Sequence, residues 1–132
     1  MPGIDTSVLV RLLVEDDKAQ CARARRLVDE AVAGGEAVFI SLLVLLETEW
    51  VLRSRYGLTK AAILDTVSRL LDSAELSFED EPAIEEALYL WRDSSADFAD
   101  CLIGVRNRRP GCRTTATFDA RAARLAGYAT LR

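Results

Sequence analysis

Four acidic residues, Asp5, Glu47, Asp100 and Asp119, have the clearest potential for chemistry in this chain. Three of them precede or open helical runs of apolar residues, and Glu47 falls inside such a run. An ionised carboxylate buried in such a place costs folding free energy unless a cation lies beside it. Mg²⁺ and Mn²⁺ prefer oxygen ligands, so a divalent metal is the simplest such cation. The chain has no histidine, and a metal site built from carboxylates alone points to phosphodiester chemistry.

The composition narrows the class of protein. The 132 residues predict one domain with a substantial hydrophobic core, and 50% hydrophobic with 29% charged residues is ordinary for a soluble globular chain. No apolar run approaches the roughly 20 residues of a membrane helix, and no leader segment is recognisable. We therefore expect a cytoplasmic protein without membrane contact.

Several catalytic and structural classes are excluded. Without histidine there is no Ser-His-Asp or Cys-His catalysis and no His-ligated zinc. The three cysteines, Cys21, Cys101 and Cys112, are odd in number and have no paired spacing. They are typical of reduced, small hydrophobic residues rather than of a disulfide framework or a zinc knuckle.

Charge is distributed unevenly along the chain. The net charge of −4 argues against a nucleic-acid partner, but residues 97–132 carry seven arginines and only three acids, Asp97, Asp100 and Asp119. A segment that is basic except at candidate metal ligands suits an RNA-cutting surface, although a solvated face of mixed charge is an equally good reading of any one arginine. The arginines are Arg106, Arg108, Arg109, Arg113, Arg121, Arg124 and Arg132.

The elements that must position these acids alternate along the chain. Apolar periodicity and cap residues predict helices over 7–14, 17–33, 41–56, 59–71, 82–92, 97–108 and 119–126. Short strands are expected at 2–6, 37–40, 75–78, 113–118 and 128–131. This order predicts an α/β fold with a parallel sheet covered on both faces. Ligands of such sheets bind beyond the carboxyl ends of the strands, where Asp5 and Asp119 lie.

Each acid also has an ordinary structural explanation. At about 100° per residue, Glu47 falls between Leu43 and Val51 on an apolar arc, whereas Glu49 projects outside it, so we expect Glu47 buried and Glu49 solvated. A salt bridge to an arginine would also satisfy Glu47. Helix capping could account for Asp5, Asp97 and Asp119, and Asp100, deeper in its helix, is the better ligand.

Four segments together resemble the PIN domain family. They are Ile4-Asp5-Thr6-Ser7-Val8-Leu9-Val10, Leu46-Glu47-Thr48-Glu49-Trp50-Val51-Leu52, Asp97-Phe98-Ala99-Asp100-Cys101-Leu102-Ile103 and Thr117-Phe118-Asp119. The resemblance covers nearly the whole chain and is strongest to the VapC-type toxins of bacterial toxin–antitoxin pairs. It implies a PIN-like three-layer α/β/α fold with a mostly parallel central sheet of about four to five strands.

The resemblance also implies an activity, a Mg²⁺- or Mn²⁺-dependent endoribonuclease in which metal-activated water hydrolyses the phosphodiester bond. Asp5 and Asp100 would be the principal metal ligands, completed by Glu47 and Asp119, with Thr6, Asp97 and Thr117 in support. Arg106, Arg108, Arg109 and Arg113 are candidates for RNA binding. The implied partners are an antitoxin of the VapB kind, an RNA such as a tRNA or rRNA loop, and a second copy of the chain. Gly104 departs from the Ala-rich helix of the family and is expected to loosen the helix of Asp100.

Two other enzyme classes match the sequence poorly. A receiver-type phosphoacceptor needs a lysine near a late strand, and the only lysines are Lys18 and Lys60. A phosphatase of the haloacid dehalogenase type needs Asp-x-Asp, but Ser7 holds the second position. A non-catalytic PIN-like module that binds a protein or RNA, and a PIN nuclease of RNA processing, remain as alternatives.

Overall fold

The computed structural model describes residues 1–131, so Arg132 of the basic segment lies outside the described residues. The chain is grouped into two compact units, Met1–Glu79 and Asp80–Arg132. The single domain expected over residues 1–132 therefore stays a prediction.

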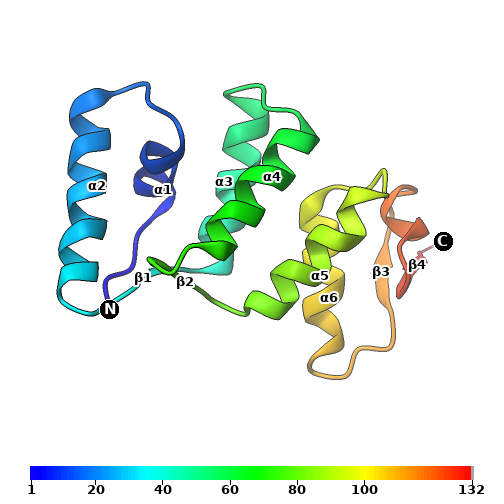
Figure 1. Cartoon of the computed structure of the whole chain (residues 1–132). Helices are drawn as coiled ribbons and strands as arrows, with labels where there is room; N and C mark the ends of the chain where they lie inside the picture. The colour runs from blue at the N-terminus through cyan, green and yellow to red at the C-terminus, as the bar shows by residue number, and fades with distance from the viewer. Residues whose placement is uncertain (132) are drawn as a thin grey trace. The chain divides into compact units, whose positions relative to one another are not determined.

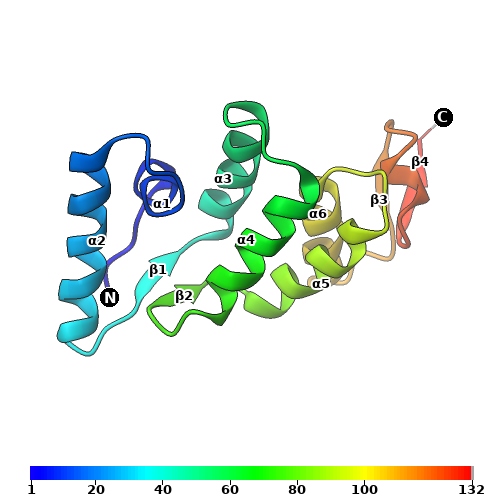
Figure 2. The ribbon, with the colours of Figure 1, turned by 45° about the horizontal axis from the view of Figure 1, so that its top comes forward.

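The first unit contains four helices and a parallel pair of strands (Figure 1). Helix α1 packs against both α2 and α3, and α3 packs against α4. Figure 2 shows β1 and β2 side by side, with Val38 opposite Leu76 and Ile40 opposite Phe78. The core joins Ile4, Leu9 and Val28 to the strand residues Val38 and Ile40. The elements are α1 (Thr6–Leu13), α2 (Lys18–Ala33), β1 (Val38–Ile40), α3 (Leu42–Ser54), α4 (Lys60–Asp72) and β2 (Leu76–Phe78).

The N-terminal segment runs along β1 without forming a full strand. Gly3 makes an isolated parallel bridge to Phe39. The amide of Phe39 donates to the carbonyl of Pro2 at 2.8 Å, and that of Ile4 donates to the carbonyl of Phe39 at 3.2 Å. Pro2 has no N–H to extend the ladder. The segment nevertheless brings Asp5 to the start of α1, as the sequence predicted.

Helix boundaries follow the cap residues. Asp17, Ser41 and Thr59 each accept a hydrogen bond from the backbone N–H three residues ahead, the geometry of an N-cap. At the other end of α3, Gly57 has a φ of +66°, a conformation that glycine adopts without steric cost. The turn fixes Arg55 and Tyr56 at the end of that helix.

The second unit is a helix pair followed by a second parallel strand pair. Helices α5 (Glu81–Arg92) and α6 (Phe98–Arg108) pack together, with the rings of Trp91 and Phe98 5.3 Å apart. Strand β3 (Thr115–Thr117) pairs with β4 (Tyr128–Thr130), and the 3₁₀ turn η1 (Ala122–Arg124) connects them. The side chain of Asn107 donates to the Thr115 hydroxyl at 3.0 Å, which joins α6 to β3.

The α-helix predicted over 119–126 is wrong. Only the 3₁₀ turn Ala122–Arg124 forms there. The Asp119 carboxylate accepts hydrogen bonds from the amides of Arg121 and Ala122, which offers this backbone an alternative to the helix. Gly127, with a φ of +87°, then leads directly into β4, so too few residues remain to offset helix nucleation.

The predicted α/β class is confirmed, because helices alternate with strands and both strand pairs in residues 1–131 are parallel. Each strand is only three residues long. None of the helices in the described residues is long and apolar enough to cross a bilayer.

Candidate functional site

Asp5 is the N-cap of α1 and is held in its ionised form. Its Oδ1 accepts hydrogen bonds from the Ser7 hydroxyl at 2.7 Å and from the Val8 amide at 3.1 Å. These bonds lower the pKa of Asp5, and the bond from the Ser7 hydroxyl has the largest effect. Its Oδ2 has no hydrogen-bond partner within residues 1–131. Asp5 therefore caps α1, as the sequence allowed, and one of its carboxylate oxygens remains for a ligand.

The predicted environments of Glu47 and Glu49 are wrong, because the structure has them the other way round. Glu47 is exposed, and Glu49 is only 3% exposed and paired with Arg53 at 2.9 Å. The prediction failed because Leu42 to Leu46 place apolar side chains all round the start of α3, so a helical wheel has no unique apolar side. The buried stripe that forms is Leu42, Leu45, Thr48, Glu49 and Leu52.

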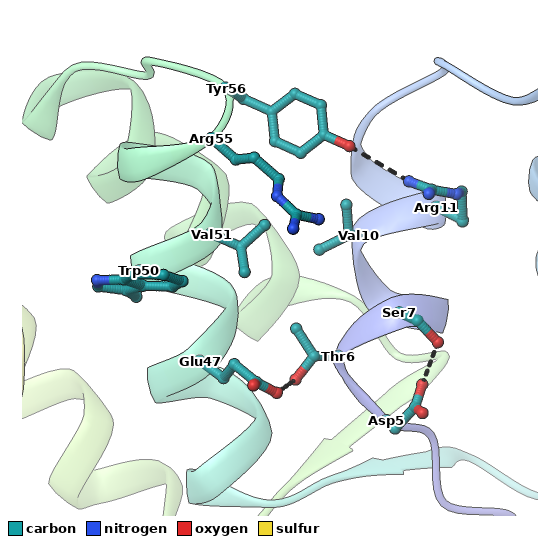
Figure 3. A pocket seen from close by; sticks show the side chains of 10 residues that line it. All are labelled: Asp5, Thr6, Ser7, Val10, Arg11, Glu47, Trp50, Val51, Arg55 and Tyr56. Atoms are coloured by element: carbon teal, nitrogen blue, oxygen red, sulfur yellow. Dashed lines mark hydrogen bonds between the residues drawn. The ribbon is translucent and has the colours of Figure 1, made fainter.

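Exposure leaves the Glu47 carboxylate accessible to a cation, which burial would not. Its Oε1 accepts a hydrogen bond from the Thr6 hydroxyl at 2.5 Å. Glu47 and Asp5 line one pocket of about 370 Å³ between α1 and α3 (Figure 3). The first unit thus brings two predicted ligands and the supporting Thr6 to one place.

The same pocket contains residues that the sequence analysis missed. Tyr56 donates from its hydroxyl to Asp16 at 2.6 Å, and Arg11 donates to Asp16 at 3.0 Å and to the Tyr56 oxygen at 3.3 Å. The hydrogen bond with Tyr56, followed by the Arg11 charge, lowers the pKa of Asp16, and Tyr56 is also the main cause that raises the pKa of Arg11. Arg55 completes this end of the pocket. The Arg-Tyr-Gly run that ends α3 was a signal available in the sequence.

In the second unit, Asp97, Asp100 and Asp119 interact electrostatically. Burial is the main cause that raises the pKa of Asp100, and the charges of Asp97 and then Asp119 raise it further. Asp97 is the N-cap of α6, yet its side chain makes no capping hydrogen bond. This cluster carries negative charge that its protein neighbours compensate only in part.

Two polar contacts fix the acids of the second unit. The Thr117 hydroxyl accepts a hydrogen bond from the Asp119 amide at 3.0 Å. The Tyr128 hydroxyl donates to the backbone carbonyl of Asp100 at 2.6 Å. Burial, followed by the Asp100 charge, raises the pKa of Tyr128 to about 12, so this hydroxyl remains a donor at neutral pH. Tyr128 is a further residue that the sequence analysis missed.

Three of the four arginines predicted to bind RNA form ion pairs inside the second unit. Arg106 and Arg109 pair with Asp80, the N-cap of α5, and Arg108 pairs with Glu86. Arg113 is exposed and has no ion pair among the described residues. The role of these four residues in RNA binding stays a prediction, and three of them also join α6 to α5.

The carboxylates present fit a hard divalent cation by their chemistry. Asp5 and Asp119 each use Oδ1 in local hydrogen bonds, Glu47 uses Oε1, and the second oxygen of each has no hydrogen-bond partner in residues 1–131. Oxygen-only donors of this kind suit Mg²⁺ or Mn²⁺. Within the described residues no three of the Asp, Glu and Cys side chains already form a closed metal cage.

Comparison with known proteins identifies the family. The chain matches the PIN domain over residues 4–128. It is also 27% identical over 132 residues to a protein named VapC ribonuclease from Aquifex aeolicus (strain VF5), and this similarity covers 99% of this chain and 96% of the relative. The matched residues include all four acids and nearly every element of both units. The chain therefore belongs to the PIN domain family.

Proposed function

We propose that this protein is a metal-dependent endoribonuclease that acts as the toxin of a toxin–antitoxin pair. One observation carries the proposal: this PIN domain chain has an acid at all four predicted positions, and Asp5, Glu47 and Asp119 each accept hydrogen bonds on one carboxylate oxygen and leave the other without a partner in residues 1–131. The similarity to a VapC ribonuclease supports RNA as the substrate and the toxin role.

Asp5, Glu47, Asp100 and Asp119 would hold the metal. When bound, Mg²⁺ or Mn²⁺ supplies an acidified water and neutralises charge on the phosphoryl group. The chain's own residues orient the ligands. Thr6 holds Glu47, the amides of Arg121 and Ala122 hold Asp119, and Tyr128 holds the backbone of Asp100. In this reaction RNA is cut to 5′-phosphate and 3′-hydroxyl ends, and no histidine is required as a base.

The proposed antitoxin would cover apolar surface beside Glu47. Leu43 and Trp50, four residues before and three after Glu47, are 79% and 57% exposed. Residues at these spacings share a helix face with Glu47. Leu12 and Leu13, also considered as contacts, pack partly buried against the core of the first unit. A partner helix seated on Leu43 and Trp50 would place its own side chains over Glu47 and block the pocket.

The test is RNA cleavage by purified, partner-free protein. A panel of tRNAs and rRNA loops is incubated with Mn²⁺, with EDTA, and with the variants Asp5→Asn and Asp100→Asn. We expect cleavage by the wild-type protein only with metal, and a loss of at least 10²-fold in each variant, because each removes a metal ligand. Cleavage that survives EDTA or both substitutions would contradict the proposal. RNA binding without cleavage would favour the non-catalytic PIN-like module.

A further inference from the structure

The pocket between α1 and α3 is acidic at one end and basic at the other. Asp5 and Glu47 line the first end, and Arg11, Arg55 and Tyr56 line the second (Figure 3). The proposed chemistry uses only the acidic end. The proposed cleavage reaction therefore gives no role to the two arginines at the other end of the pocket.

Arg55 is available for an anion. Neighbouring arginines of the first unit are engaged, Arg53 with Glu49 and Arg25 with Asp29 and Glu75. Arg55 is exposed and has no ion pair or side-chain hydrogen bond to residues 1–131. Figure 3 shows its guanidinium directed from α3 toward α1, into the space beside Val10 and Val51.

Arg11 is the fixed counterpart of Arg55. Its Nε donates to the Gln20 side chain at 2.6 Å, and one terminal nitrogen donates to Asp16 and Tyr56. The other terminal nitrogen makes no hydrogen bond in the described part of the chain. A guanidinium held by three neighbours loses little further conformational entropy when it binds a ligand.

The spacing along α3 shows which anion the basic end would meet. Glu47 and Arg55 are eight residues apart, about 12 Å along the helix axis at 1.5 Å per residue. Figure 3 shows the Arg55 guanidinium beside Val10 and Val51, at the end of the pocket away from Asp5 and Glu47. A polyanion whose charges repeat along a strand would reach both ends of the pocket.

We propose that Arg55, with Arg11 beside it, binds a backbone phosphate of single-stranded RNA that lies next to, and not at, the cleaved bond. This inference rests on the proposed ribonuclease function, because that function places RNA at Asp5 and Glu47. The site is distinct from the cluster Arg106, Arg108, Arg109 and Arg113 of the second unit. Arg55 is a substrate-binding residue here and has no part in the bond cleavage.

A simpler role for Arg55 is the stabilisation of its own helix. It occupies the C-cap of α3, where a positive charge interacts favourably with the helix dipole. That role predicts an effect of substitution on stability alone. The phosphate site predicts an effect on RNA affinity and on its salt dependence.

The experiment compares Arg55→Ala with Arg26→Ala. Arg26 on α2 is also an exposed arginine without an ion pair in residues 1–131, but it lies outside the pocket. Both variants lose the same charge. Binding of a short fluorescein-labelled single-stranded RNA is measured by polarisation in EDTA, where cleavage is stopped, over a range of salt concentrations. KM and kcat for tRNA cleavage are measured with Mn²⁺, and thermal unfolding is recorded.

Arg55→Ala should weaken RNA binding about tenfold, as loss of one charge-assisted contact does. It should lower the slope of log K against log salt by about 0.7 and raise KM with little change in kcat. Arg55→Lys should restore the slope and only part of the affinity. Arg26→Ala should change none of these values.

The proposal is overturned if Arg55→Ala binds RNA within twofold of wild type with an unchanged slope, if both alanine variants weaken equally, or if neither wild type nor variant binds RNA. The binding arm does not depend on turnover. Wild-type protein that binds RNA through Arg55 but never cleaves would disprove the nuclease and keep the phosphate site. If the protein cleaves RNA and Arg55→Ala leaves KM unchanged, the nuclease proposal is kept and the phosphate site is disproved.

Discussion

Tyr128 packs its ring against Gly104 of α6 so closely that a Cβ atom at residue 104 would lie 2.7 Å from the ring carbon Cε2. The hydroxyl of the same side chain donates to the carbonyl of Asp100, one turn earlier. The glycine was expected to loosen this helix, but α6 runs without a break from Phe98 to Arg108. Gly104 makes room for the residue that ties β4 to the helix of Asp100.

Gly104→Ala should destabilise the protein. Alanine favours a helix by up to about 1 kcal/mol relative to glycine. Overpacking against Tyr128 should outweigh that gain and lower the free energy of unfolding by about 1–3 kcal/mol in urea. Gly34→Ala is the control, because a Cβ there meets only ordinary contacts at 3.5 Å and 3.6 Å. Equal or greater stability of Gly104→Ala would show that the ring of Tyr128 moves aside freely.

Tyr128→Phe separates the hydrogen bond of Tyr128 from its packing. The ring remains against Gly104, while the carbonyl of Asp100 loses its donor, so we expect a loss of about 1 kcal/mol in stability. If the bond positions Asp100, the Mn²⁺ concentration at half-maximal cleavage should rise several-fold more than stability alone explains. That concentration is measured well below the unfolding temperature, with Tyr89→Phe as control, because Tyr89 is 70% exposed. An unchanged metal requirement would limit Tyr128 to a structural role.

Glu47 and Glu49 should respond in opposite ways to substitution by glutamine. Glu47→Gln should reduce cleavage at least 10²-fold and change stability by less than about 0.5 kcal/mol, because its side chain is exposed. Glu49→Gln removes the buried charge paired with Arg53 and should leave cleavage within a few-fold of wild type. Cleavage assays and urea unfolding on both variants give the comparison. If Glu49→Gln lost activity and Glu47→Gln did not, Glu49 and not Glu47 would be the residue needed for cleavage.

Asp100 should titrate above the ordinary range of an aspartate in the metal-free protein. Burial, Asp97 and Asp119 all raise its pKa. A raised pKa means that the folded state binds the proton more tightly, so this group contributes less stability as the pH rises through the interval above 3.8. Asp97→Asn should move the pKa of Asp100 down, as followed by carboxyl-carbon NMR. A pKa of Asp100 at or below 3.8, or one indifferent to Asp97→Asn, would contradict this account.

Most helices and strands could be predicted from the sequence because their signals are local. Ser41 and Thr59 cap helices, Pro82 lies in the first turn of α5, and Gly57 ends the turn after α3. The helix predicted over 119–126 was wrong because the Asp119 side chain binds the backbone amides that would start it. Periodicity detects apolar spacing and contains no information on such bonds.

The places of these acids on the helices could be predicted from the sequence, but the environments of their side chains could not. The positions of Asp5 and Asp100 at helix starts follow from local pattern. The burial of Glu49 rather than Glu47 depends on which side of α3 faces the core. The bonds from Tyr128 to Asp100 and from Tyr56 to Asp16 join residues 28 and 40 positions apart, which no local pattern reveals.

If the carboxylates of this PIN domain cut RNA with a metal, the chemistry of the new RNA ends tests that activity most directly. A tRNA is incubated with wild-type protein and with Asp100→Asn, in Mn²⁺ and in EDTA, and its ends are identified by selective ligation and phosphatase treatment. We predict new 5′-phosphate and 3′-hydroxyl ends that require both Mn²⁺ and Asp100. New 5′-hydroxyl and cyclic phosphate ends, or ends that form equally in EDTA, would contradict it.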